Sequence, residues 1–184
     1  MYEILGSLSG KAYNEMISLL VHRCDSFIFH LPNMGKLMIN ERNAKFLSSY
    51  PVGYSKEENQ NEHREYVDRV DKFLDVIKND IVRDYTDTGY LDQVSSIEMR
   101  IYHVSISSRT KHFFELTDNF SNWRYPSLPE NPCFLSKGKC IFQCIAHENL
   151  CFIYSDDKEF ELLLKRNRIE FVQSGDLQTP RFEG

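Results

Sequence analysis

The spacing of apolar residues changes sharply after residue 24, and this change limits the fold more than any other feature of the chain. Over residues 12–24 the apolar positions recur at intervals of three and four, as on one face of an α-helix. Over residues 25–31 the interval falls to two, which is typical of a β-strand, and Pro32-Asn33 ends that strand. A helix followed at once by a strand predicts a mixed fold. The helical positions are Tyr13, Met16, Ile17, Leu20, Val21 and Cys24, and the strand positions are Phe27, Phe29 and Leu31.

A second, longer helix is expected after residue 55. Ser55 followed by Glu58 fits a capping box, in which each side chain satisfies a free backbone amide of the other. The pattern predicts an amphipathic surface helix that ends between Asp84 and Gly89. Its apolar stripe is Tyr66, Val70, Phe73, Leu74, Ile77 and Ile81, and its polar face carries Asp68, Asp71, Lys72, Asp75 and Lys78.

The rest of the chain favours strands with one further helix. Strands are expected at residues 97–106, 133–135, 140–146, 150–154 and 169–172, and Asp156 or Asp157 can cap a helix that runs to about residue 167. Residues 35–51 and 109–119 fit either type of element, and the prolines within 122–132 indicate a loop. The prediction is an α+β fold in which two or three amphipathic helices pack on an antiparallel sheet. Residues 1–172 would form a single domain and residues 173–184 a flexible tail.

Composition excludes several classes of protein. With 41% hydrophobic and 13% aromatic residues among 184, the chain is too apolar for a disordered protein. The formal net charge of -5 argues against a nucleic-acid coat. No apolar run approaches the length of a membrane span, and no basic start precedes an apolar stretch as in a signal peptide. The odd count of five cysteines then favours free thiols in the cytoplasm.

The charge is unevenly distributed along the chain. Residues 56–92 hold 11 Asp or Glu and 6 Lys or Arg, whereas the remaining residues hold 16 of each, so the whole net charge lies in one segment. One interpretation is a solvated helix face. The other is an acidic surface, carrying Asp68, Asp71 and Asp75, that docks on a partner protein with a basic surface.

Two motifs that suggest a bound phosphate or metal fit those ligands poorly. The run Gly6-Ser7-Leu8-Ser9-Gly10-Lys11 is one residue short of a phosphate loop, has Ala12 in place of the metal-binding hydroxyl and follows no expected strand. The cysteines at 133, 140, 144 and 151 are spaced Cys-x6-Cys-x3-Cys-x6-Cys, which lacks the two close pairs of a zinc site. Cys140 and Cys144 would share one strand face, where core packing competes with zinc binding. We therefore predict neither metal nor cofactor.

Histidines give a weak catalytic signal. His147-Glu148 falls at an expected hairpin tip and is counted among the candidate binding residues. The pair could also supply a general acid and base, although a turn attracts polar residues for other reasons. His103 lies on an apolar strand face, where a hydrogen-bonded core histidine competes with a metal ligand.

The aromatic segment 113–126 contains the single Trp of the chain. Trp123, Arg124 and Tyr125 are residue types that most often anchor protein interfaces, so this segment is a candidate partner or ligand surface. The alternative is a loop whose aromatic side chains cap the core.

Residues 121–130 read Ser-Asn-Trp-Arg-Tyr-Pro-Ser-Leu-Pro-Glu and are followed by Cys133-Phe134 and by Ala146-His147-Glu148. This pattern, over residues 113–172, resembles a small Gram-positive bacterial family whose members are often labelled stage III sporulation protein AH-like. The resemblance implies a bacterial or phage-related cytoplasmic protein of the kind found in immunity and conflict systems. It implies no catalytic residues. Since a sporulation protein of that name would carry a membrane anchor, the function in the label is not carried over.

Three functional hypotheses follow. The first is a non-enzymatic binding protein that neutralises a partner by occlusion, as an immunity protein, antitoxin or anti-defence protein, through the acidic helix and the Trp123 segment. The second is a small-molecule or nucleotide-signal binder in which Arg100, Arg109 or Arg124 holds a phosphorylated ligand. The third is a hydrolase that uses His147 and Glu148.

Overall fold

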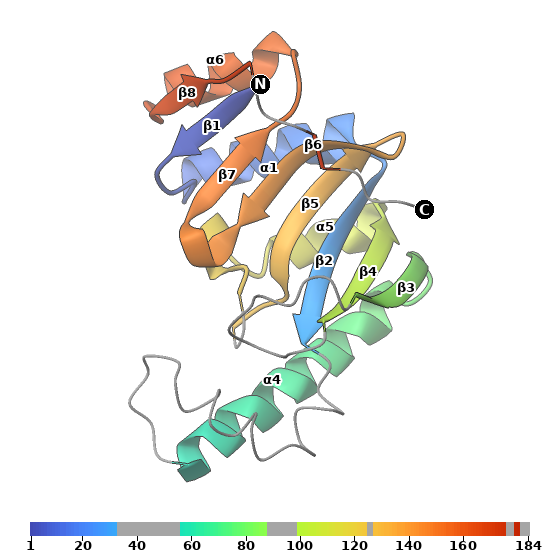
Figure 1. Ribbon diagram of the computed structural model, residues 1–184. Helices are drawn as coiled ribbons and strands as arrows, with labels where there is room; N and C mark the ends of the chain where they lie inside the picture. The colour runs from blue at the N-terminus through green and yellow to red at the C-terminus, as the bar shows by residue number, and fades with distance from the viewer. Residues whose placement is uncertain (33–55, 88–98, 125–126, 176–178, 181–184) are drawn as a thin grey trace.

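The structure, a computed structural model, describes residues 1–32, 56–87, 99–124, 127–175 and 179–180 (Figure 1). Its strands form one sheet of eight in the order β3-β4-β2-β5-β6-β7-β1-β8, and every neighbouring pair is antiparallel. The predicted α+β class is confirmed. The strands are β1 Tyr2–Leu5, β2 Ser26–Pro32, β3 Ile81–Asp87, β4 Met99–Ser105, β5 Glu130–Ser136, β6 Lys139–Ile145, β7 Leu150–Ile153 and β8 Phe171–Gln173.

Helices cover one face of this sheet. Figure 1 shows α1 and α5 behind the strands, while α4 projects beyond the sheet at its N-terminal end. The main core lies between the sheet and the helices, and it includes Phe27, Phe134 and Phe142, which are fully buried in one row across three strands. The helices are α1 Lys11–Arg23, α4 Lys56–Ile77, α5 Ser108–Phe114 and α6 Lys158–Arg166, with short 3-10 turns η1 Phe120–Asn122 and η2 Ala146–Glu148.

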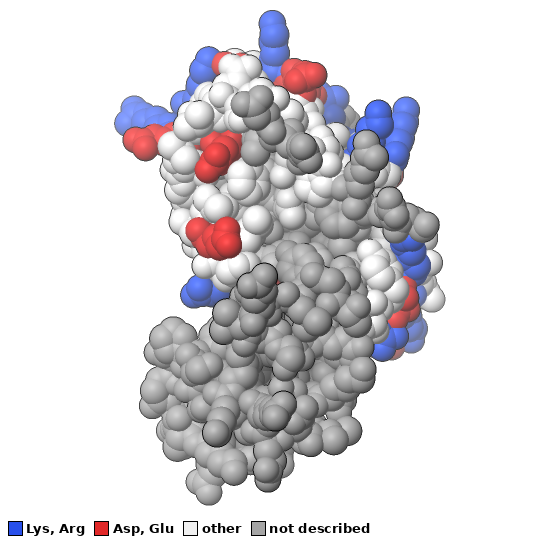
Figure 2. Space-filling view, in the orientation of Figure 1, with Lys and Arg blue, Asp and Glu red and all other residues white. Residues whose placement is uncertain are grey.

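The opposite face of the sheet carries a smaller apolar cluster. Alternation along β2 sends Phe27 and Phe29 to the main core and Ile28 to this second cluster, which also holds Ile101 and Cys133. Figure 2 looks onto this face, and in its described part the Lys and Arg side chains gather along the edges rather than at the centre. Both faces of the central strands are therefore buried.

Capping residues fix the start of two helices. Ser107 and Thr110 form a reciprocal capping box at the start of α5. Asp157 caps α6 by accepting a hydrogen bond from the backbone N–H of Glu159 at 3.0 Å, which confirms the predicted helix start. The expected capping box at Ser55 lies outside the described residues.

The predicted end of the second helix is wrong. α4 ends at Ile77, and the chain continues as the edge strand β3. The backbone N–H of Asp80 donates to the Ile77 carbonyl at 2.8 Å, and the Asp80 carbonyl accepts from the N–H of Ser105 at 2.8 Å. Ile81 continues the apolar spacing of the helix, but it pairs with Val104 in β4, so tertiary pairing decides its conformation.

Two further strands differ from expectation. β1 is too short to show a periodic pattern, although Tyr2 and Ile4 are buried. β5 begins at Glu130, inside the predicted loop, and includes Pro132. The pairing with β2 shifts register between Ile28 and His30 at this point, and such an irregularity tolerates a proline that cannot donate to the ladder.

Candidate functional site

Trp123 is a core residue, so its interpretation as an exposed interface anchor is wrong. Its side chain is 0% exposed, and its indole contacts the ring of Phe113 edge-on at a centroid distance of 4.7 Å. The indole Nε1–H donates to the hydroxyl of Tyr13 at 3.2 Å, and that hydroxyl donates to the Phe114 carbonyl at 2.8 Å. The alternative prediction for this segment, a loop whose aromatic side chains cap the core, fits the buried position of Trp123. Arg124 is exposed, and Tyr125 lies outside the described residues.

The segment around Trp123 nevertheless forms one wall of a groove. A hollow of about 700 Å³ lies between α4, α5 and the segments at 116–122 and 127–129, and we call it the α4–α5 groove. Val76 on α4 and Leu116 after α5 are each 56% exposed and both line it. Its other apolar lining residues are Val70, Phe73, Ile77, Phe113, Leu128 and Pro129. A volume of this size falls within the range of ligand pockets.

Basic side chains line the groove from both helices. α4 contributes Arg69 and Lys72, and α5 contributes Arg109 and His112, each pair one helical turn apart. The imidazole Nδ1 of His112 lies 2.9 Å from a carboxylate oxygen of Glu115. Lys72 is exposed and has no ion-pair partner among the described residues. The groove therefore combines apolar walls with a cationic margin.

Arg109 has a structural partner at the end of α4. Its Nε and Nη2 donate to the two carboxylate oxygens of Asp80 at 3.0 and 3.1 Å. These hydrogen bonds hold the pKa of Asp80 below its usual value. Arg100 also pairs with a carboxylate, but its Nε and Nη2 both donate to a single oxygen, Oδ2, of Asp84. Two of the three arginines expected to hold a phosphorylated ligand, Arg100 and Arg109, are thus already paired with carboxylates. Of the three, only Arg109 lines the groove.

The three predicted acidic residues occupy another side of α4. Asp68, Asp71 and Asp75 are exposed and lie three and four positions apart, so they form a stripe along the helix. Asp75 accepts a hydrogen bond from Lys78 at 2.7 Å. None of the three lines the groove. The helix therefore presents an acidic stripe on one side and groove residues on another.

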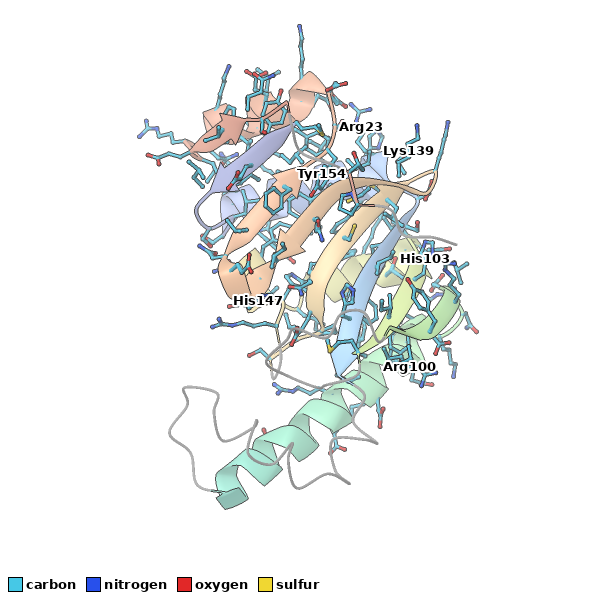
Figure 3. The ribbon with its side chains drawn as sticks, in the orientation of Figure 1. Arg23, Arg100, His103, Lys139, His147 and Tyr154 are labelled. Carbon is cyan, nitrogen blue, oxygen red and sulfur yellow. The ribbon has the colours of Figure 1, made fainter. Side chains whose placement is uncertain are left out.

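His147 and Glu148 form the predicted turn between β6 and β7. Their side chains are 55% and 53% exposed, and Nε2 of His147 lies 3.6 Å from Oε1 of Glu148. Figure 3 shows His147 at one end of the sheet, apart from His103 on β4. Neither residue of the pair lines the groove. The geometry brings the pair to an exposed tip, without a third group from the predicted set.

His103 lies on the second face of the sheet, opposite Arg83 of β3 and Ile28 of β2. Burial lowers its pKa, and the charge of Arg83 lowers it further. Among the described residues, its buried Nδ1 atom has no hydrogen-bond partner, which differs from the hydrogen-bonded histidine that the sequence predicts.

The four later cysteines form two separate pairs. The prediction that Cys140 and Cys144 share a strand face is wrong, because Cys140 packs in the second cluster and Cys144 in the main core. Cys133 and Cys140 have their sulfur atoms 3.1 Å apart, and Cys144 lies directly opposite Cys151 between β6 and β7. All five cysteines are free and buried. Within the described part of the chain no three His, Cys, Asp or Glu side chains gather as metal ligands would.

The Gly6–Lys11 run does follow a strand, β1, contrary to the prediction. Its backbone is engaged with the protein itself: the N–H of Gly10 donates to the Asp118 carbonyl at 2.7 Å, and the Leu8 carbonyl accepts from Phe120 at 3.1 Å. α1 begins without a side-chain cap. These bonds hold the run against residues 118–120, at the start of η1.

No family model, curated protein or solved structure matches the chain. The resemblance to the Gram-positive family therefore stays a prediction. Among the helices in the described ranges, none is both long and apolar enough to cross a bilayer.

Proposed function

We propose that this chain is a non-enzymatic binding protein that docks on a partner protein through the α4–α5 groove and neutralises it by occlusion. The observation that carries the proposal is the exposure of Val76 and Leu116 within one concave surface. Apolar side chains that are grouped and left in water mark interaction sites more often than single exposed ones do. The groove would bury them against an apolar segment of the partner.

The acidic stripe gives α4 a second role in this proposal. Asp68, Asp71 and Asp75 lie on the same helix as the groove residues, and they are exposed. Charges at the margin of an interface mainly accelerate encounter, whereas buried apolar contacts slow dissociation. A partner with a basic surface would thus be attracted by the stripe and held by the groove. Immunity proteins, antitoxins and anti-defence proteins of bacterial or phage cytoplasm act in this manner, and we propose this class.

The experiment that tests the proposal compares two leucines of similar exposure. Leu116 lines the groove and is 56% exposed, whereas Leu162 on α6 is 60% exposed. α6 lies at the opposite end of the molecule from α4 (Figure 1). Leu116→Asp should abolish capture of the partner from cells that express the chain naturally, while Leu162→Asp should capture as the wild type does. Equal capture by both variants would remove the groove from the proposal.

A second matched pair of variants distinguishes a specific partner from proteins that bind any exposed apolar surface. Val76 lines the groove, and Val82 on β3 is 61% exposed outside it. A partner that Val76→Asp loses and Val82→Asp keeps must contact the groove. Proteins lost in both variants bind exposed apolar surface without selectivity and would count against the proposal.

The volume and cationic margin of the groove favour a small anionic ligand as the second candidate. Lys72 lies beside apolar walls, an arrangement that suits a molecule with an apolar body and an acidic group. Mass spectrometry of material released when the purified protein is denatured tests this candidate. A stoichiometric anionic compound that Leu116→Asp no longer retains would favour it over the protein partner.

A further inference from the structure

A bulge in β6 brings two cysteines together on the second face of the sheet. In the β5–β6 pairing Phe134 lies opposite Phe142, but Leu135 lies opposite Cys140, so Ile141 is an extra residue in β6. Strict alternation would place Cys140 on the same face as Phe142. The bulge turns it to the other face, where Cys133 of β5 lies.

The two sulfur atoms lie closer than ordinary packing requires. Their separation is 3.1 Å, and a disulfide of about 2.05 Å would need an approach of about 1 Å. Both side chains are 1% exposed and pack with Ile28, Ile101 and Leu135. Burial is the main reason that the pKa of Cys133 is raised, and the contact with Cys140 raises it further, so the Cys133 thiol is held in its neutral form.

We propose that Cys133 and Cys140 form a redox modification site that closes to a disulfide in exchange with a small external disulfide. Cys133 lies opposite Gln143 and Cys140 lies opposite Leu135, so the two cysteines are diagonal neighbours on paired strands. This placement and the direct sulfur contact carry the proposal. It is independent of the α4–α5 groove, since neither cysteine lines that hollow.

The exchange has two steps whose atoms balance. After the hairpin opens locally, Cys140, next to the exposed turn at 137–139, loses its proton to water and attacks one sulfur of the external disulfide. A mixed disulfide forms, and one external thiolate leaves and takes up a proton. Cys133 then loses its proton and attacks the sulfur of Cys140, which releases the second external thiolate. Two protein thiols are oxidised and one external disulfide is reduced to two thiols.

The expected result of oxidation is a local restraint on the β5–β6 hairpin. The disulfide would close a loop that contains only residues 134–139, and short loops remove little conformational entropy from the unfolded chain. We therefore expect oxidation to pin the β5–β6 hairpin without a large change in global stability. Residues 127–129 line the α4–α5 groove and directly precede β5. The disulfide would therefore restrain the strand that follows these groove residues.

Peptide mapping of the full chain tests the proposal. The native protein is incubated with oxidised glutathione, free thiols are blocked by alkylation, and the chain is digested with trypsin. Cleavage after Lys137 and Lys139 separates Cys133 from Cys140, so their disulfide joins the peptides 125–137 and 140–158. A bond between Cys144 and Cys151 stays within the second peptide and changes only its mass. Joined peptides are expected, with fragmentation placing the bond on Cys140.

Variants distinguish the proposed pair from other pairings. The double variant Cys144→Ala/Cys151→Ala should keep the joined peptides, whereas Cys140→Ala should reduce them at least about tenfold, because Cys133 then lacks a contacting thiol. Joined peptides that persist in Cys140→Ala, or that appear only in urea, would overturn the proposal. Where Cys140→Ala does not fold, the fragmentation pattern of the wild type decides, since a bond from Cys133 to Cys144 or Cys151 refutes it.

Discussion

Phe73 and Phe113 are stacked with their ring centroids 3.7 Å apart, and this contact joins α4 to α5. Both rings line the α4–α5 groove on one side, and Phe113 meets the buried indole of Trp123 on another. The proposed binding surface is therefore built directly on the main core. A ligand in the groove would rest on side chains whose positions are fixed by packing, which lowers the entropic cost of binding.

Trp123→Ala should destabilise the fold. Removing a fully buried indole leaves a cavity beside Phe113 and Phe114, and we expect a loss of about 3–5 kcal/mol in the free energy of unfolding. Urea denaturation followed by circular dichroism measures it. Trp123→Phe is the matched control and should lose less. If Trp123→Ala unfolds at the wild-type urea concentration, the indole is not part of the core.

Tyr13→Phe tests the hydrogen-bond chain behind that indole. The hydroxyl of Tyr13 accepts from Trp123 and donates to the Phe114 carbonyl, so its removal leaves two buried polar groups unsatisfied. We expect a cost of about 1–3 kcal/mol in the free energy of unfolding. Tyr154→Phe serves as the control, because its hydroxyl bonds to one side chain, Gln143, in a partly buried site. A cost for Tyr13→Phe no larger than that of the control would contradict the two-bond role.

Asp80→Asn should loosen the junction between α4 and β3. The Asp80 carboxylate is 8% exposed and receives two hydrogen bonds from Arg109, whose own side chain remains about half in water. Because solvent screens this pair, we expect Asp80→Asn to cost only about 1 kcal/mol of stability at neutral pH. The folded pKa of Asp80 is lowered, so the contribution is present above its unfolded pKa and is lost as pH falls through the folded one.

The measurement is urea denaturation of the wild type and Asp80→Asn at neutral and acidic pH, and their stabilities should converge on acidification. Asp75→Asn is a suitable control, because Asp75 is 72% exposed and pairs with Lys78 at the surface. If the difference in the free energy of unfolding between the wild type and Asp80→Asn grows in acid, the ion pair is not the cause of that difference.

The helices and strands that could be predicted from the sequence are mostly those with a long periodic pattern of apolar residues. The apolar spacing over residues 12–24 and the alternation after it gave α1 and β2 within one or two residues, since each buries one face in the main core. β3 could not be found in this way. Ile77 and Ile81 are four apart, which fits a helix, and only the pairing of Ile81 with Val104 and the turn held by Asp80 favour a strand.

The site was less accessible to sequence reasoning than the fold. Trp123 and its neighbours have the residue types of an interface, but residue type does not report burial, and the indole fills the core. The groove combines positions from α4, α5 and two loop segments that are far apart in sequence. Leu116, two residues after the buried Phe114, is an exposed apolar residue of the groove, but its residue type alone does not show that exposure.

Stability should fall in mild acid because of His103. Burial and Arg83 lower its folded pKa below the ordinary value of 6.5, while Asp25 opposes them weakly. As pH falls through 6.5 the unfolded chain takes up the proton first, so the free energy of unfolding decreases until the folded pKa is reached. His103→Gln should show a smaller decrease between neutral pH and pH of about 5 in urea denaturation. His147→Gln is the exposed control, and a decrease unchanged in His103→Gln would assign the effect to other groups.

The groove should bind an anionic apolar dye without any partner. Anilinonaphthalene sulfonate combines an aromatic body with one negative charge, which suits the walls at Val76 and Leu116 and the amine of Lys72. We expect saturable fluorescence enhancement, with affinity reduced about tenfold by Leu116→Asp, equivalent to about 1.4 kcal/mol. Lys72→Gln should weaken binding more at low salt than at high salt, because added ions screen the charge. Leu162→Asp should bind as the wild type does, and an equal loss in that variant would mean that the dye reports exposed leucines anywhere on the surface.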